Sequence, residues 1–332
     1  MSTLGANNLS IHDVVRRSGP NGEYQAIAEM LQEINTLATD APWIQGELPA
    51  GHMNTVRDSL PTFSTRQPNS SGITPSKSTT SQTLEAPEYI EAWSDTDELV
   101  LKYGGDSANA IASEMPAFSE AAMQTVSDRI IYGNGATTVG QVNGLAVRYN
   151  STSATNGRNV ILGGAVGGQT DCMSIYLCEY GTGKFSLWYP KGSTGGLMVK
   201  DWGERPVSVS GATIVRRQVQ FQWGFGLAVD DWRRVVRIAN IDKSLLIAGT
   251  GADLPFRLNQ ATHCLPRNVS TGRRAFYMNR TTFLYLDDQC RNDVQTGGQL
   301  KYEKVEGQEM HTWRGIPINI FDTLTEAETA IS

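Results

Sequence analysis

The segment from Thr62 to Thr83 constrains the fold of this chain more than any other. Twelve of its 22 residues are Ser or Thr, and Pro68, Gly72 and Pro75 stand among them. Such a composition cannot bury enough apolar surface to offset the conformational entropy that is lost on ordering. The segment therefore cannot belong to a core. It is either a flexible linker or a long loop that becomes ordered only against a partner.

The two flanks of this segment favour the second interpretation. Met53–Val56 and Ile90–Leu101 can both form strands. We therefore predict an extended hairpin over residues 50–101 with a flexible tip at 62–83. Ordinary hairpin loops have only a few residues, and loops as long as this one are usually functional or disordered.

Helical periodicity occurs twice before residue 134. Apolar residues recur at i, i+3, i+4 and i+7 over 23–37 and again over 107–131, which predicts a helix in each range. The first helix could pack on its own domain or on a neighbouring subunit. Pro116 lies inside the second range, where it either kinks one long helix or starts another. The apolar stripe of the first helix consists of Ile27, Met30, Leu31, Ile34 and Leu37.

The character of the sequence changes after Asn134, where short strand-forming runs alternate with Gly-rich turns. One short helix is expected near residues 252–261. Because helices and strands occupy separate blocks rather than alternating, the predicted fold class is α+β. The predicted strands cover residues 159–162, 174–179, 184–189, 197–199, 213–225, 227–238, 282–286 and 316–321.

No stretch of the chain carries a catalytic signature. Gly181–Lys184 resembles the end of a phosphate-binding loop, but Cys178 and Phe185 stand where that motif requires Gly and Ser or Thr. Asp230 and Asp231 could suggest the paired acids of a sugar-cleaving enzyme, yet adjacent residues on a strand point to opposite faces. We therefore predict that the chain is not an enzyme, and we interpret both acids as turn or ion-pair residues.

Charge and cysteine spacing exclude further classes. The formal net charge is −6, whereas proteins that coat phosphate backbones usually carry a positive excess. No apolar run approaches the roughly 18–20 residues of a membrane span, and the polar N-terminus lacks the pattern of a signal peptide. We therefore expect cytoplasmic synthesis and no membrane partner. The four cysteines are widely spaced, which predicts reduced thiols, no zinc site and no cofactor.

Several stretches, taken together and in order, resemble one known family. They are residues 143–149 (Asn-Gly-Leu-Ala-Val-Arg-Tyr), 188–193 (Trp-Tyr-Pro-Lys-Gly-Ser), 222–233, 236–241 and 315–318, followed by Asp322. Their order is similar to that of the major capsid proteins of short-tailed bacteriophages of the epsilon-fifteen and Bordetella phage type, which have the Hong Kong 97-like capsid fold. The resemblance is strongest from about residue 143 to the C-terminus.

The resemblance implies a layout for the whole chain. Residues 1–49 would be an N-terminal arm that contains the helix at 23–37, and residues 50–101 would be an extended hairpin that reaches over a neighbouring subunit. Residues 102–332 would form strand-rich peripheral and axial domains on a spine helix near 107–131. Some relatives crosslink their subunits through a hairpin lysine. Lys77 is available here, but nothing in the sequence identifies an acceptor or a catalytic acid.

The resemblance also implies a function, namely a major capsid protein that assembles into pentamers and hexamers of an icosahedral shell in the bacterial cytoplasm. The shell would enclose double-stranded DNA without sequence-specific binding, and scaffolding, portal and cement proteins are further candidate partners. The alternative is another virion structural protein, such as a tail, adhesin or decoration component, although no repeat or coiled coil typical of a tail fibre occurs. The candidate intersubunit contacts are Arg66, Lys77, Asp230, Asp231, Arg233 and Arg237.

Overall fold

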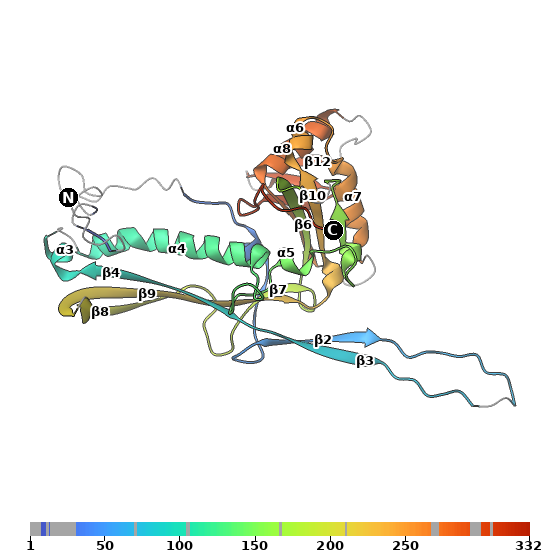
Figure 1. The fold of residues 1–332 in the computed structure, drawn as a ribbon, viewed down its shortest axis with the longest axis horizontal. Coiled ribbons are helices and arrows are strands. Elements are labelled where there is room, and N and C mark those ends of the chain that lie inside the picture. The colour runs from blue at the N-terminus through green and yellow to red at the C-terminus, as the bar shows by residue number, and fades with distance from the viewer. Residues whose placement is uncertain are drawn as a thin grey trace.

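The computed structural model describes residues 8–10, 13, 31–69, 72–103, 107–165, 168–209, 211–266, 272–292, 300–305 and 308–332. Three parts are visible in Figure 1: a long helix that lies along extended strands, a body of helices and strands, and a hairpin that projects away from both. Helices and strands fall largely into separate stretches of the chain, with some alternation after β10, and the predicted α+β class is confirmed.

The elements follow one another along the chain in this order. The helices are α2 (Leu37–Asp40), α3 (Glu98–Tyr103), α4 (Ser107–Tyr132), α5 (Leu145–Arg148), η1 (Gly157–Asn159), η2 (Trp232–Arg234), α6 (Lys243–Ile247), α7 (Leu254–Cys264) and α8 (Arg280–Asn292). The strands are β1 (Trp43–Gln45), β2 (His52–Ser59), β3 (Thr79–Glu85), β4 (Glu88–Asp97), β5 (Val160–Leu162), β6 (Cys172–Tyr180), β7 (Phe185–Tyr189), β8 (Met198–Val209), β9 (Ala212–Val229), β10 (Val235–Asp242), β11 (Arg273–Met278), β12 (Leu300–Val305), β13 (Gln308–Trp313) and β14 (Ile316–Ile320).

One sheet runs from the body into the extended strands that lie along α4. Within the described residues its order is β12-β13-β14-β11-β6-β7-β9-β4, while β10 pairs with β6 and β5, β8 pairs with β9, and β1 pairs with β7. The strand β9 makes the connection, since its C-terminal end pairs with β7 and the rest of it pairs with β4 and β8.

The strand β6 separates two apolar cores because its side chains alternate between the two faces of the sheet. One core also contains the C-terminal end of α4, and the other is covered by α7 and α8. Of the β6 residues, Tyr176, Cys178 and Tyr180 belong to the first core, and Met173, Ile175 and Leu177 belong to the second.

The helix α4 covers one face of the ladder formed by β4, β9 and β8 (Figure 1). The ring of Phe118 stacks on the ring of Phe221 with centroids 4.5 Å apart, and Val126 and Ile130 enter the first core. The helix is continuous through Pro116, and it occupies the range of the helix predicted at 107–131. No helix among the described residues is both long and apolar enough to cross a membrane.

The helix predicted at 23–37 is not seen in the part of that range that the structure describes. Residues 31–36 are not helical, and α2 begins only at Leu37; residues 23–30 lie outside the described part. Tertiary hydrogen bonds replace the helical ones, because the Ile34 N–H donates to the Asp322 carboxylate and the Asp322 N–H donates to the Ile34 carbonyl. Leu31, expected on the apolar face, is 83% exposed.

The strand predicted at 282–286 is a second error, because these residues lie inside α8. The side chain of Asn279 caps this helix by accepting a hydrogen bond of 2.8 Å from the Thr282 N–H. Thr282 and Leu286 are both buried, four residues apart on one helical face. The spacing of these buried residues therefore follows the helical period. Over only five residues, this spacing cannot be distinguished from that of a strand.

The hairpin is shorter than the one expected over 50–101. The strand β2 pairs with β3 in antiparallel register from His52–Glu85 to Ser59–Thr79, so the last residues of the expected flexible tip belong to β3. The expected second strand exists as β4, but it pairs with β9 instead.

The last residues of the chain run across the body and hold several elements together. Glu328 exchanges backbone hydrogen bonds with Cys172 at 3.1 and 2.9 Å. The Ile331 N–H donates to the side chain of Asn240 at 2.8 Å, and the Asn240 amide donates back to the Ile331 carbonyl at 2.7 Å. This C-terminal tail therefore holds the start of β6 and the end of β10 in place.

Candidate functional site

The tip of the hairpin is held only by its own residues among those that the structure describes. Ser76 receives a hydrogen bond from the Thr62 N–H and donates one to the Thr62 carbonyl, at 3.0 and 2.9 Å. Arg66 and Lys77 are both exposed here, and Phe63 is 97% exposed. Exposed cations and an exposed aromatic ring do not stabilise the fold of a single subunit. Such exposure is typical of a contact surface.

The first strand of the hairpin is anchored to the body by a partly buried acid and a histidine. The Nε2 atom of His52 lies 3.8 Å from Oδ1 of Asp230, and the His52 ring packs against Trp188 with centroids 5.9 Å apart. Burial raises the pKa of Asp230 above its ordinary value, and the nearby His52 offsets only part of this effect. The Asn54 amide also donates to the Val229 carbonyl at 3.2 Å.

The second strand is held by a bidentate ion pair between Glu85 and Arg148. Both guanidinium NH₂ groups of Arg148 donate to the Glu85 carboxylate at 2.7 Å, and the Arg148 Nε–H donates to the Asn143 carbonyl at 2.7 Å. Paired, planar contacts of this kind fix direction as well as distance. Both strands of the hairpin are therefore anchored to the body near His52 and Glu85. We call this end the root of the hairpin, and the tip extends from it.

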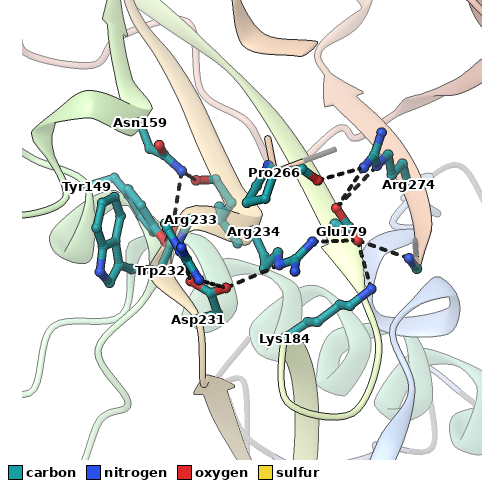
Figure 2. A network of polar contacts seen from close by, with 12 residues as sticks. Tyr149, Asn159, Glu179, Lys184, Asp231, Trp232, Arg233, Arg234, Pro266 and Arg274 are labelled. Atoms are coloured by element: carbon teal, nitrogen blue, oxygen red, sulfur yellow. Dashed lines mark hydrogen bonds and ion pairs between the residues drawn. The ribbon is translucent and has the colours of Figure 1, made fainter. Parts of the chain in front are cut away.

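Asp231 organises the turn between β9 and β10 (Figure 2). Its carboxylate accepts from the Arg233 N–H at 3.1 Å, from Arg233 Nε at 2.9 Å and from Arg234 Nε at 3.2 Å. Burial opposes ionisation, but these donors outweigh it, so the pKa of Asp231 lies below its ordinary value. Arg233 remains more than half exposed, whereas Arg234 is buried.

Glu179 lies at the centre of the same network and is fully buried (Figure 2). Its carboxylate is 2.8 Å from Lys184 Nζ, 2.9 Å from Arg234 Nη1 and 3.1 Å from Arg274 Nη2, and it also accepts from the Gly272 N–H at 2.9 Å. Burial alone would raise the pKa of Glu179, but this hydrogen bond and the three cations hold it below its ordinary value. The network joins β6, the turn after β6, η2 and β11.

Arg237, expected at an intersubunit contact, is buried inside its own chain. Its side chain is 3% exposed, and its guanidinium donates to Glu328 at 2.9 Å, to the Tyr149 carbonyl at 2.9 Å and to Ser174 at 3.2 Å. This low exposure leaves the guanidinium little surface for a neighbouring subunit. Arg237 is an internal residue that holds the C-terminal tail.

A family model described as "Major capsid protein GP7" matches residues 19–332. The chain belongs to this family. Among solved structures, a chain of the structure of bacteriophage Epsilon15 is similar, with 24% sequence identity, a TM-score of 0.81, and coverage of 100% of this chain and 99% of that chain. The fold is therefore the Hong Kong 97-like capsid fold of the Epsilon15 type. No curated protein matches the chain.

Other phage structures are similar only in part. A chain of Microbacterium phage Oxtober96 has 13% identity and a TM-score of 0.45, covering 69% of this chain and 98% of that chain. A capsid chain of Myoviridae phage XM1 has 10% identity and a TM-score of 0.45, covering 67% and 97%.

The residues that organise this major capsid protein are mostly ones that motif analysis passed over. Glu179, Arg274 and Glu328 were not singled out from the sequence, because partners 95 and 91 residues apart along the chain leave no local pattern. One signal was present. Glu179 stands in the otherwise apolar β6, and an acid in a buried strand requires cations around it.

The four cysteines differ in burial. Cys172 and Cys178 are buried, while Cys264 and Cys290 are partly exposed. Burial raises the pKa of Cys172 to about 11, which keeps this thiol protonated at neutral pH. In the described ranges, no group of three or more His, Cys, Asp or Glu side chains could hold a metal ion.

Proposed function

We propose that this major capsid protein closes into pentamers and hexamers and that these build an icosahedral shell around double-stranded DNA. The observation that carries the proposal is the match of the capsid family over residues 19–332. One face of each subunit would bind a different face of the next, and such heterologous contacts close into rings. The chain would act as a building block and catalyse no reaction.

We propose that the hairpin lies across a neighbouring subunit. The support is its geometry: both strands are anchored at the base, while the tip carries exposed Phe63, Arg66 and Lys77. Arg233 is the remaining exposed candidate for a contact between subunits. Asp230 and Asp231 turn toward their own chain and would act by shaping the root of the hairpin and the adjacent turn.

We further propose assembly in the bacterial cytoplasm, with scaffolding, portal and cement proteins as partners. The net charge of −6 supports a wall that contains DNA without binding a particular sequence, since tight coating of phosphates requires a positive excess. A peripheral domain built on α4 and an axial domain built on the body would divide residues 102–332, with residues 1–49 as the arm.

Electron microscopy of the expressed chain tests the main proposal. We expect rings of five and six subunits together with closed shells, and light scattering should show large species. A stable monomer at every concentration and salt, even after co-expression with other phage proteins, would contradict it.

A further inference from the structure

The two strands of the hairpin are joined to the body in different ways. Within the described residues, β2 and β3 pair only with each other, and they leave the body as a separate ribbon (Figure 1). The bidentate contact of Glu85 with Arg148, at 2.7 Å, fixes the β3 side. His52 is the residue of β2 in register with Glu85, and its contact with Asp230 is longer.

The contact between His52 and Asp230 is incomplete as a hydrogen bond. Nε2 of His52 lies 3.8 Å from Oδ1 of Asp230, whereas N–H···O bonds have lengths of about 2.7–3.2 Å. His52 is only 9% exposed. Oδ1 of Asp230 and Nδ1 of His52 are both buried, and neither has a hydrogen-bond partner among the described residues. Because an unpaired buried acceptor is unfavourable, a shorter contact would stabilise the root of the hairpin.

The body side of this contact is rigid. Trp188, whose ring centroid lies 5.9 Å from that of His52, is fully buried. A Cβ atom at Gly226 or Gly46 would come within 2.2 or 2.8 Å of the indole, so the ring is packed tightly from both sides. The Asp230 N–H donates to the Lys184 carbonyl at 2.7 Å. A shorter distance is therefore reached by a tilt of the hairpin rather than by movement of the body.

We propose that His52 and Asp230 form a latch that closes when the hairpin binds a neighbouring subunit. A tilt about the fixed contact of Glu85 with Arg148 brings the His52 Nε2–H within hydrogen-bond distance of Asp230 Oδ1. The neighbour binds the hairpin in this direction, and closure strengthens that binding by the same factor by which binding favours closure. This inference rests on the proposed function, and it adds that an internal contact sets the direction of the hairpin.

Two substitutions of His52 test the latch. His52→Phe keeps a ring against Trp188 but removes the donor, so it should raise the concentration required for assembly about tenfold, the effect of losing one hydrogen bond to a charged group. His52→Gln places an amide N–H near the position of Nε2 and should assemble within about threefold of the wild type. Both variants should unfold like the wild type as free subunits, because the latch is open there. A His52→Phe variant that assembles like the wild type would overturn the proposal, as would a His52→Gln variant that is equally defective.

A variant without the hairpin tip separates the latch from a general defect in assembly. Replacing residues 60–78 by a short Gly-Ser turn removes the part of the hairpin that binds the neighbour. In this background His52→Phe should weaken assembly no further, because the latch acts only through the bound hairpin. A further loss of the same size would show that His52 acts elsewhere and would overturn the inference.

A high-resolution reconstruction of the assembled shell measures closure directly. The distance from His52 Nε2 to Asp230 Oδ1 should be about 3 Å in the shell. A distance as long as the 3.8 Å of the single subunit would overturn the latch while leaving the proposed function intact. A wild type that never assembles would instead contradict the proposed function.

Discussion

Glu179 shows how a single carboxylate can determine the stability of the body. It is fully buried and surrounded by Lys184, Arg234 and Arg274, so its removal leaves several cations without their common partner. We predict that Glu179→Ala lowers the free energy of unfolding by about 3–5 kcal/mol. Urea denaturation of unassembled subunits measures this. Arg233→Ala is the matched control, because this arginine belongs to the same network but is more than half exposed.

The same carboxylates make the stability dependent on pH. The pKa values of Glu179 and Asp231 lie below their ordinary values, so each group binds its proton more readily in the unfolded chain. Their contribution is therefore complete above the ordinary pKa of a carboxyl group, about 4, and is lost as the pH falls through the lowered folded values. The unfolding midpoint of subunits should fall steeply below about pH 4. In Glu179→Gln this fall should be shallower, and an unchanged slope would contradict the assignment.

Asp230 and Asp231 are neighbours with opposite electrostatics, which predicts different responses to the same substitution. Asp231 is stabilised as an anion by two arginines, and Asp231→Asn should cost about 1–3 kcal/mol. Burial raises the pKa of Asp230, so its charge is unfavourable and Asp230→Asn should change stability by less than about 1 kcal/mol. Thermal unfolding of both variants provides the comparison. Equal losses would show that the two sites do not differ in this way.

At the scale of elements, the hairpin is the part whose removal should separate folding from assembly. Replacing residues 60–78 by a short Gly-Ser turn keeps the paired Ser59 and Thr79 and all contacts at the root. We expect an unchanged unfolding midpoint and weakened assembly, measured by light scattering and microscopy. Shells of normal stability would show that the segment is only a linker.

Two further experiments separate the contributions of the hairpin tip. Arg66→Ala/Lys77→Ala removes only its charges, and exposed ion pairs contribute about 1 kcal/mol or less each, so this variant should assemble better than the one that lacks the tip. Limited proteolysis should cut free subunits within residues 62–78 and spare assembled shells. Equal cleavage in both states would contradict a contact with a neighbour.

The sequence predicted elements where the pattern is local and failed where partners are distant. The range of α4 and the apolar β6 follow from periodicity, because their burial is one-sided or complete. Residues 31–36 carry a helical stripe, but the hydrogen bonds exchanged between Ile34 and Asp322 decide their conformation. The pairing of β2 with β3 also escaped prediction, since β3 has a composition as polar as a linker and is exposed along most of its length.

At the scale of the whole molecule, the candidate intersubunit residues differ in whether their exposure could be predicted from the sequence. The exposed positions of Arg66 and Lys77 follow from the Ser/Thr-rich composition around them, which excludes burial. The burial of Arg237 could not be predicted, because its partner Glu328 lies 91 residues away. Long-range ion pairs leave no periodic trace in one sequence.

Glu328 links parts of the molecule that are far apart in the chain. It accepts from Tyr132 at the end of α4 at 2.6 Å and from Arg237 in β10 at 2.9 Å. We predict that Glu328→Ala lowers the free energy of unfolding by about 3–5 kcal/mol, because a buried arginine loses its counter-ion. Tryptophan fluorescence in urea measures this. Glu326→Ala removes a more exposed acid of the same tail and should have a much smaller effect; equal losses would contradict the role of Glu328.

The position of this tail in the sequence has a consequence for the timing of synthesis. Residues 326–331 are made after every element that they fasten, and they supply partners for Lys243, Arg237 and Asn240. A nascent chain on the ribosome consequently lacks these contacts until residues 326–331 have left the exit tunnel. The contacts that close the body thus form later than the elements that they hold together.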